Sequence, residues 1–175
     1  MSEDEKAKYE VVATFPRGIF LTKAREFDMQ YVIDNYRDGD RHEAEVAGEE
    51  RPHVWSFEQC WIVRSANGDI LGHLGFVPQA NESFLSRVRV FCFMSCENAN
   101  KHKLAFVAAS KPILRWMTAQ CPPWVTDIIT CPLESYTASI QWHERVLGFH
   151  RVGRIQYGDE AFLYFHLSRK EIEYV

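Results

Sequence analysis

The sequence lacks the features that would direct it to a membrane, a secretory route or a nucleic acid. None of its apolar runs approaches the roughly 20 residues that a membrane-spanning helix needs. The net charge of −4 is mild and offers no basic surface for nucleic acid or anionic lipid. The polar, acidic start, residues 1–6, does not resemble a secretory signal. We therefore expect a soluble protein, cytoplasmic where it is made, with neither nucleic acid nor membrane as a partner.

The cysteines lack any paired Cys-x-x-Cys spacing. There are five of them, an odd number, and most lie within apolar runs: Cys60, Cys92, Cys96, Cys121 and Cys131. This pattern predicts buried free thiols in a reducing compartment and no metal. A zinc site that adds His102 or His150 to the cysteines is the alternative that the sequence leaves open.

The length of 175 residues fits a single domain. A domain of this size buries roughly 70% of its unfolded surface. Hydrophobic residues make up 46% of the chain and aromatic residues 14%, which is enough for one core. No repeat or linker interrupts the chain, so we expect a charged N-terminal tail over residues 1–8 and one domain over residues 9–175.

The segment 137–149 gives the clearest local signal. Ala138, Trp142 and Val146 recur every four residues, which predicts an amphipathic helix with a broad apolar face. Gly148 should end this helix in the left-handed conformation, and Phe149 should fold back onto the last turn. We therefore expect a short helix that leads directly into a closing pair of strands.

The remaining elements are predicted from the spacing of apolar residues, from turn residues and from continuous apolar runs. Asn67-Gly68 between two apolar runs is typical of a hairpin, and continuous apolarity near Phe91 indicates a central strand covered on both faces. Proline at position 112 should kink or restart its helix. The full expectation is: strand 9–15, helix 22–36, a charged connection 37–51 with about one helical turn, hairpin 60–64 and 70–77, strand 87–94, helix 104–118, strand 124–130, helix 137–147, and hairpin 151–155 with 161–167.

This order of elements, together with Leu147-Gly-Phe149, resembles the GCN5-related N-acetyltransferases (GNAT). The resemblance implies an α/β fold: a mixed, mostly antiparallel twisted sheet flanked by helices, in the order strand-helix-hairpin-strand-helix-strand-helix-hairpin. In active members a glycine-containing loop after the central strand holds the pyrophosphate of acetyl-CoA with backbone amides and the helix dipole. The corresponding loop here, residues 96–104, contains no glycine. The resemblance therefore implies a degenerate acyl-CoA site, and no cofactor is expected.

The family's proton donor is also absent from its usual position. Many members keep a tyrosine four residues before the glycine of the Gly-Phe pair, where it protonates the departing thiolate, but Glu144 stands there in this sequence. No residue is assigned as catalytic, and Glu134, Tyr136 and Glu144 remain candidates. His73 and His143 are expected to be structural.

A working acyltransferase is the alternative. Asn100, Lys101, His102 and Lys103 gather positive charge at the start of the predicted helix, where phosphate could still bind. On this interpretation the four residues bind acetyl-CoA through side chains instead of a glycine loop.

Several short segments resemble a subgroup, the acetyltransferase-like internal virion proteins of short-tailed bacteriophages. The matching segments are Phe93-Met-Ser95, 100–106, 110–116, Ile140-Gln-Trp142 and Leu147-Gly-Phe149. The resemblance implies a virion or assembly protein, made in the host cytoplasm and incorporated in a phage particle, that acts through contacts with other virion proteins or with itself. The acidic tail, the segment 37–51, and Trp55 with Phe57 are the candidate contact surfaces.

Overall fold

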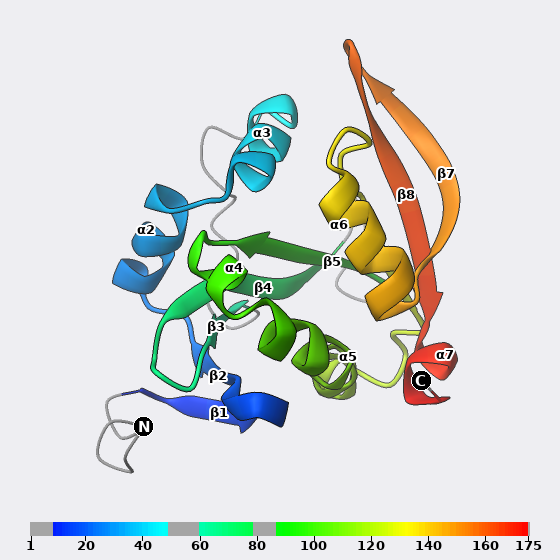
Figure 1. Ribbon diagram of the computed structural model, residues 1–175. Helices are drawn as coiled ribbons and strands as arrows, with labels where there is room; N and C mark the ends of the chain where they lie inside the picture. Colours follow the sequence, from blue (N-terminus) through cyan, green and yellow to red (C-terminus); the bar gives the residue numbers. More distant parts are fainter. Residues whose placement is uncertain (1–8, 49–59, 79–86, 175) are drawn as a thin grey trace.

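The computed structural model describes residues 9–48, 60–78 and 87–174 (Figure 1). The predicted tail 1–8 and the predicted contact residues Trp55 and Phe57 lie outside these ranges. None of the helices in the described part of the chain is long and apolar enough to cross a bilayer.

A single eight-stranded sheet organises the molecule, in the spatial order β1-β2-β3-β4-β5-β6-β8-β7. Its neighbours are antiparallel except for β5 and β6, which run parallel. The predicted α/β class with a mostly antiparallel sheet is confirmed. The strands are β1 (Val11–Thr14), β2 (Phe20–Lys23), β3 (Cys60–Arg64), β4 (Ile70–Pro78), β5 (Val88–Ser95), β6 (Asp127–Thr130), β7 (His150–Tyr157) and β8 (Glu160–Ser168).

Helices pack on both faces of this sheet. One apolar cluster joins α5 and η3 to β5 and β8 through Phe91, Met117, Leu147 and Phe165. A second, smaller cluster lies between α2 and the other face of β3 and β4. The β7–β8 hairpin stands beyond α6 (Figure 1). The helical elements are η1 (Pro16–Gly18), α2 (Glu26–Asp34), α3 (Asp38–Val46), α4 (Asn98–Lys101), α5 (Lys103–Gln120), α6 (Thr137–Gln141), η3 (Trp142–Leu147) and α7 (Arg169–Tyr174).

The helix predicted over residues 22–36 is wrong at its start. Residues Phe20–Lys23 form strand β2, which pairs with β3 from Phe20 opposite Arg64 to Lys23 opposite Trp61. The helix begins only at Glu26. The pairing with β3, some 40 residues away in sequence, overrides the helical spacing of apolar residues in this segment. A local sequence pattern cannot predict a strand partner at that distance.

The charged segment 37–51 is also more structured than predicted. Nine of its residues form helix α3, and Asp40 and Ala44, four residues apart, are buried on one side of it. Pro112 does not restart its helix, because α5 continues through it as one element. Proline has no N–H to donate to the carbonyl of Ala108, four residues earlier. Ala108 is exposed, so water can take the place of this donor.

The predicted helix stop at Gly148 is confirmed. Gly148 has a φ of 87°, and its N–H donates to the carbonyl of His143, five residues back. The Phe149 N–H donates to the same carbonyl at 2.9 Å, and the Phe149 ring is buried in the core. The last turns, η3, are therefore wider than an α-helix, a π-helical feature that the four-residue spacing did not predict.

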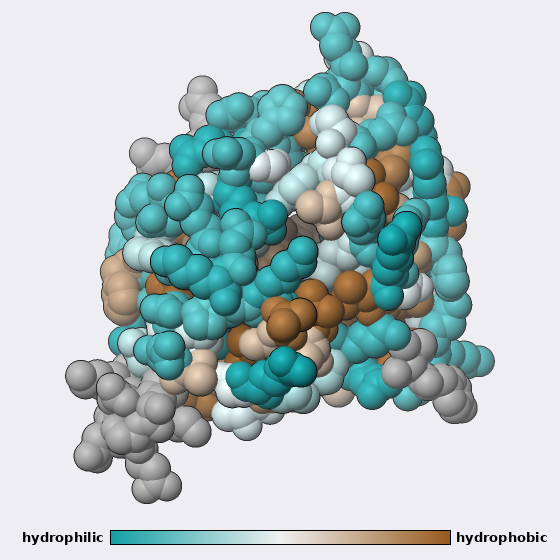
Figure 2. Space-filling view, viewed as in Figure 1, coloured by the Kyte–Doolittle hydropathy of each residue, from teal (hydrophilic) through white to brown (hydrophobic). Residues whose placement is uncertain are grey.

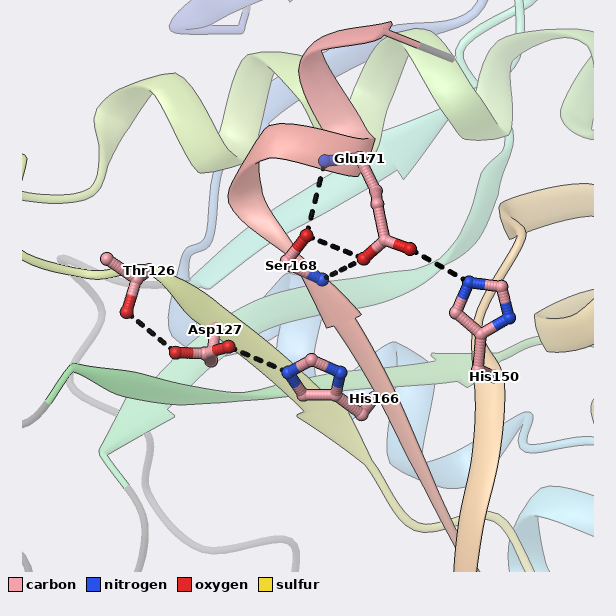
Figure 3. Close-up of polar contacts among 6 residues, drawn as sticks. All are labelled: Thr126, Asp127, His150, His166, Ser168 and Glu171. Atoms are coloured by element: carbon pink, nitrogen blue, oxygen red, sulfur yellow. Dashed lines mark hydrogen bonds and ion pairs between the residues drawn. The ribbon is translucent and has the colours of Figure 1, made fainter.

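Helix α7, which the sequence interpretation missed, begins with a capping box formed by Ser168 and Glu171 (Figure 3). The Ser168 N–H donates to the Glu171 carboxylate at 2.9 Å, and the Glu171 N–H donates to the Ser168 hydroxyl at 3.3 Å. His150 on β7 contacts the other carboxylate oxygen at 3.0 Å. The hydrogen bonds from Ser168 lower the pKa of Glu171 to about 2. These contacts hold α7 against the ends of β7 and β8.

Candidate functional site

A cavity of about 300 Å³ opens where β5 separates from β6. The two strands pair only from Val88 opposite Asp127 to Val90 opposite Ile129. Beyond this point β5 continues to Ser95 without pairing to β6, and α3, α4, α5, α6 and η3 surround the space. Figure 2 shows a hollow near the centre of this face, with hydrophilic residues along much of its rim. Strand divergence, a property of the backbone, therefore creates the cavity.

Three aromatic side chains form one wall of the cavity. The ring centroids of Phe93 and Phe106 are 5.0 Å apart, those of Phe106 and Trp142 5.6 Å, and those of Phe93 and Trp142 5.2 Å. The indole N–H of Trp142 donates to the Ser110 hydroxyl at 3.0 Å, which fixes the orientation of the ring. This wall is apolar, and it suits the hydrocarbon part of a ligand.

Asp40 on α3 provides a buried polar group in the cavity lining. Its carboxylate accepts the Ser95 N–H at 3.2 Å, the Ser95 hydroxyl at 2.6 Å and the Tyr136 hydroxyl at 3.1 Å. Burial raises the pKa of Asp40, and these hydrogen bonds with the nearby Arg37 offset only part of that effect. Burial and the Asp40 carboxyl also raise the pKa of Tyr136, which makes this phenol a weaker proton donor.

Gly39 allows Tyr136 to reach Asp40. A Cβ atom at position 39 would overlap the Tyr136 ring. The sequence interpretation missed Arg37 and Asp40 as cavity residues because it treated 37–51 as a solvated connection, and it assigned no role in a site to Ser95 on the predicted strand. The available signal was Ala44, a small apolar residue in a charged segment, which lies four residues after Asp40 and therefore on the same side of a helix.

The candidate residues predicted from the sequence divide into two groups. Tyr136, Asn100 and Lys103 line the cavity. Lys101 and His102 point elsewhere: the Lys101 ammonium donates to Asn98 at 3.2 Å, and the His102 ring lies 3.0 Å from an Asp69 oxygen.

The two candidate glutamates lie outside the lining of this cavity. Glu134 forms surface ion pairs with Arg154 at 2.8 Å and with Arg151 at 3.4 Å. Glu144 is exposed on η3. The fold therefore brings neither carboxylate to the polar group formed by Asp40 and Tyr136.

The loop that follows β5 uses part of its backbone donors internally. Five N–H groups donate to carbonyls of the chain: Cys96 to Leu71, Glu97 to Asn35, Ala99 to Cys96, Asn100 to Glu97, and His102 to Ala99. The short helix α4 occupies this segment, and α5 follows after one residue. These five amides are therefore not available to a phosphate, whatever the side chains around them provide.

The two histidines that were predicted to be structural are both buried. His143 contacts the Ser139 carbonyl at 2.8 Å and the Thr130 hydroxyl at 3.3 Å, and burial lowers its pKa to about 4. His73 contacts the Tyr36 hydroxyl at 3.2 Å, and burial lowers its pKa to about 3. Both rings are therefore neutral at physiological pH.

Sequence comparison gives no relatives, since no protein-family model matches the chain and no curated protein does. Structural similarity is extensive. The aminoglycoside acetyltransferase AAC(6')-Ib in complex with coenzyme A and kanamycin superposes with a TM-score of 0.64 at 19% identity, over 90% of this chain and 99% of that one. Spermidine N-acetyltransferase from Vibrio cholerae in complex with CoA and spermine gives 0.62 at 9% identity, over 89% and 98%. A GCN5-related N-acetyltransferase from Kribbella flavida gives 0.60 at 15% identity, over 87% and 99%. The chain therefore has the GNAT acetyltransferase fold.

Proposed function

We propose that this chain is a GNAT-fold protein that no longer transfers acyl groups from acetyl-CoA and instead acts through protein contacts. The supporting observation is the loop after β5, where five backbone N–H groups are already bonded to carbonyls. Pyrophosphate binding by such a loop depends on unpaired amides at a helix start. An incoming pyrophosphate could use these five N–H groups only by breaking the bonds that they already make.

The contact role rests on the sequence resemblance to internal virion proteins of short-tailed phages. Under this proposal the scaffold is retained in a virion or assembly intermediate, and its partners are other virion proteins or further copies of the chain. The raised pKa of Tyr136 agrees with the loss of chemistry, because a poorer acid protonates a thiolate less readily.

Calorimetry with acetyl-CoA tests the lost cofactor site. We expect a dissociation constant weaker than about 100 μM, which corresponds to less than roughly 5.5 kcal/mol of binding. AAC(6')-Ib, titrated under identical conditions, is the control for an intact site. Micromolar binding that disappears in the variant Lys101→Ala with Lys103→Ala would contradict the proposal and favour the enzyme.

Light scattering over a range of concentrations, alone and with candidate virion proteins, tests the contact role. We expect self-association or a complex with one of these partners. A strict monomer that binds none of them and acetylates a small amine would refute the proposal.

An active N-acyltransferase is the second candidate, and the cavity itself favours it. Arg37, Lys103 and Arg145 bring three cations to a space that has an aromatic wall and a buried carboxyl group. Such a site could hold an anionic acyl donor by side chains, with Tyr136 as the acid. An assay with acetyl-CoA and amines such as spermine and kanamycin distinguishes the candidates: turnover that Tyr136→Phe abolishes supports the enzyme, and no turnover supports the contact role.

A further inference from the structure

The face of the sheet opposite the cavity concentrates sulfur. Cys60, Cys96, Met29 and Met94 all belong to the apolar cluster between α2 and the strands β3 to β5. The whole chain has five cysteines and four methionines, so this small cluster holds nearly half of its sulfur-bearing side chains. His73, directly opposite Met94 in the β4–β5 pairing, brings an imidazole to the same face.

Cys60 is the centre of this arrangement. Its Sγ lies 3.8 Å from the Met29 Sδ and 3.7 Å from the His73 Nδ1. Metal–sulfur and metal–nitrogen bonds of about 2.0–2.3 Å place two ligands of one three-coordinate ion roughly 3.5–4 Å apart. Both distances from Cys60 fall in that range, so Cys60 can share an ion with either neighbour, and a site with all three ligands requires Met29 and His73 to approach the same ion.

Tyr36 orients the imidazole. Its hydroxyl lies 3.2 Å from the His73 Nε2. In the tautomer that carries the proton on Nε2, this nitrogen donates to the hydroxyl oxygen and the Nδ1 lone pair faces Cys60. Histidines that bind metals commonly have their second nitrogen held in this way.

The types of ligand and their burial select the ion. Within the described residues, no three side chains drawn from His, Cys, Asp and Glu gather as a metal site, so a zinc centre of the usual kind is not formed there. A thioether as third ligand favours a soft ion, and thiolate with thioether ligands is typical of copper(I). Cys60 and His73 are 1% and 0% exposed. One thiolate with a monovalent ion is neutral overall, whereas a divalent ion would leave a net positive charge in this apolar cluster, which is costly.

We propose that Met29, Cys60 and His73 form a binding site for copper(I). On binding, the Cys60 S–H bond breaks, the thiolate sulfur bonds to the ion, and the proton leaves to solvent. The copper remains in the +1 state throughout, so no oxidant or reductant takes part. Met29 is the half-buried member of the three and places the solvent side of the site on α2.

The test is an anaerobic competition for copper(I) between the full chain and the chromogenic chelator bathocuproine disulfonate. We expect one equivalent of copper per chain to move from the chelator to the protein. Cys60→Ala should remove this transfer, and Tyr36→Phe should weaken the affinity by about 10–100-fold. Met29→Leu, which keeps the volume and apolar character, should weaken it roughly tenfold through the loss of one ligand.

Met117→Leu is the matched control, because Met117 is buried in the other core cluster. It should bind copper as the wild type does. X-ray absorption of the copper complex should show sulfur and nitrogen neighbours, with one sulfur fewer in Met29→Leu. If Cys60→Ala loses its circular dichroism spectrum, Met29→Leu and Tyr36→Phe decide the question. Failure of the wild type to take copper, equal affinity in Cys60→Ala and wild type, or equally tight zinc binding would overturn the proposal.

Discussion

Two buried carboxylates on consecutive helices meet opposite kinds of partner. Asp28 on α2 is 1% exposed and forms an ion pair with the guanidinium of Arg64, which is itself buried. Arg64 also donates to the Gly68 carbonyl at 3.0 Å, and its guanidinium lies 4.2 Å from the centre of the Tyr9 ring. A full positive charge therefore faces Asp28 from within the protein.

Asp40 on α3 is almost as deeply buried, at 6% exposure, but its hydrogen bonds come from the hydroxyls of Ser95 and Tyr136 and from one amide. Arg37 is the nearby cation, and it lowers the pKa of Asp40 less than the hydrogen bonds from Ser95 and Tyr136 do. A hydroxyl can rotate and exchange its partner for a ligand, whereas a buried guanidinium cannot leave its carboxylate cheaply. The first arrangement stabilises the fold, and the second leaves a polar group at a cavity.

The largest expected effect follows from removing the cation of the first pair. Arg64→Ala should lower the free energy of unfolding by about 3–5 kcal/mol, because Asp28 would remain buried without its counter-charge. Urea denaturation measures the loss. Lys23→Ala is the control, since Lys23 pairs with Glu10 on the surface and should change stability by less than about 1 kcal/mol. A loss below about 1 kcal/mol in Arg64→Ala would mean that Asp28, like Asp40, does not depend on a buried counter-charge.

A smaller effect is expected where Gly39 touches the second site. Gly39→Ala should cost about 1–3 kcal/mol, because the new methyl group overlaps the Tyr136 ring and separates its hydroxyl from Asp40. In a Tyr136→Ala background the sign should reverse to a gain of up to about 1 kcal/mol, since alanine is the better helix former. Equal costs in the two backgrounds would show that the Tyr136 ring does not limit position 39.

The smallest effect should be a gain. The pKa of Asp40 is higher in the folded state than its ordinary value near 3.8. The wild type therefore loses stability as the pH rises from this ordinary pKa through the pKa of the folded state. Asp40→Asn removes this loss, so its melting temperature at pH 7 should exceed that of the wild type, and the difference should vanish below about pH 4. A less stable variant at pH 7 would mean that the ionised carboxylate is well compensated.

Local signals in the sequence predicted much of the fold. Gly148 with Phe149 and the turn at Asn67-Gly68 depend on residues within a few positions of each other, and both occur as expected. Strand β2 could not be predicted in this way, since its partner β3 lies some 40 residues away.

The candidate site shows the same division. The missing glycines of the loop after β5 are visible in the sequence, and Tyr136 was recognised as a candidate. Asp40 was not recognised, because its role exists only once Ser95 and Tyr136, about 55 and 96 positions away, are folded against it. A charged residue in a charged segment gives no sign that it will be buried.

The short pairing of β5 with β6 also divides the molecule mechanically. Three residue pairs join the antiparallel strands β1 to β5 to the antiparallel strands β6 to β8, whereas β4 and β5 pair over seven residues. Within the described strands this is the one parallel junction, and few hydrogen bonds cross it. Under a force that pulls β4 and β6 apart, this seam should open before the pairing of β4 with β5 does. Each half would keep its own strand pairing, and the apolar cluster that joins Leu71 and Phe91 to Ile128 and Phe165 would have to open with the seam.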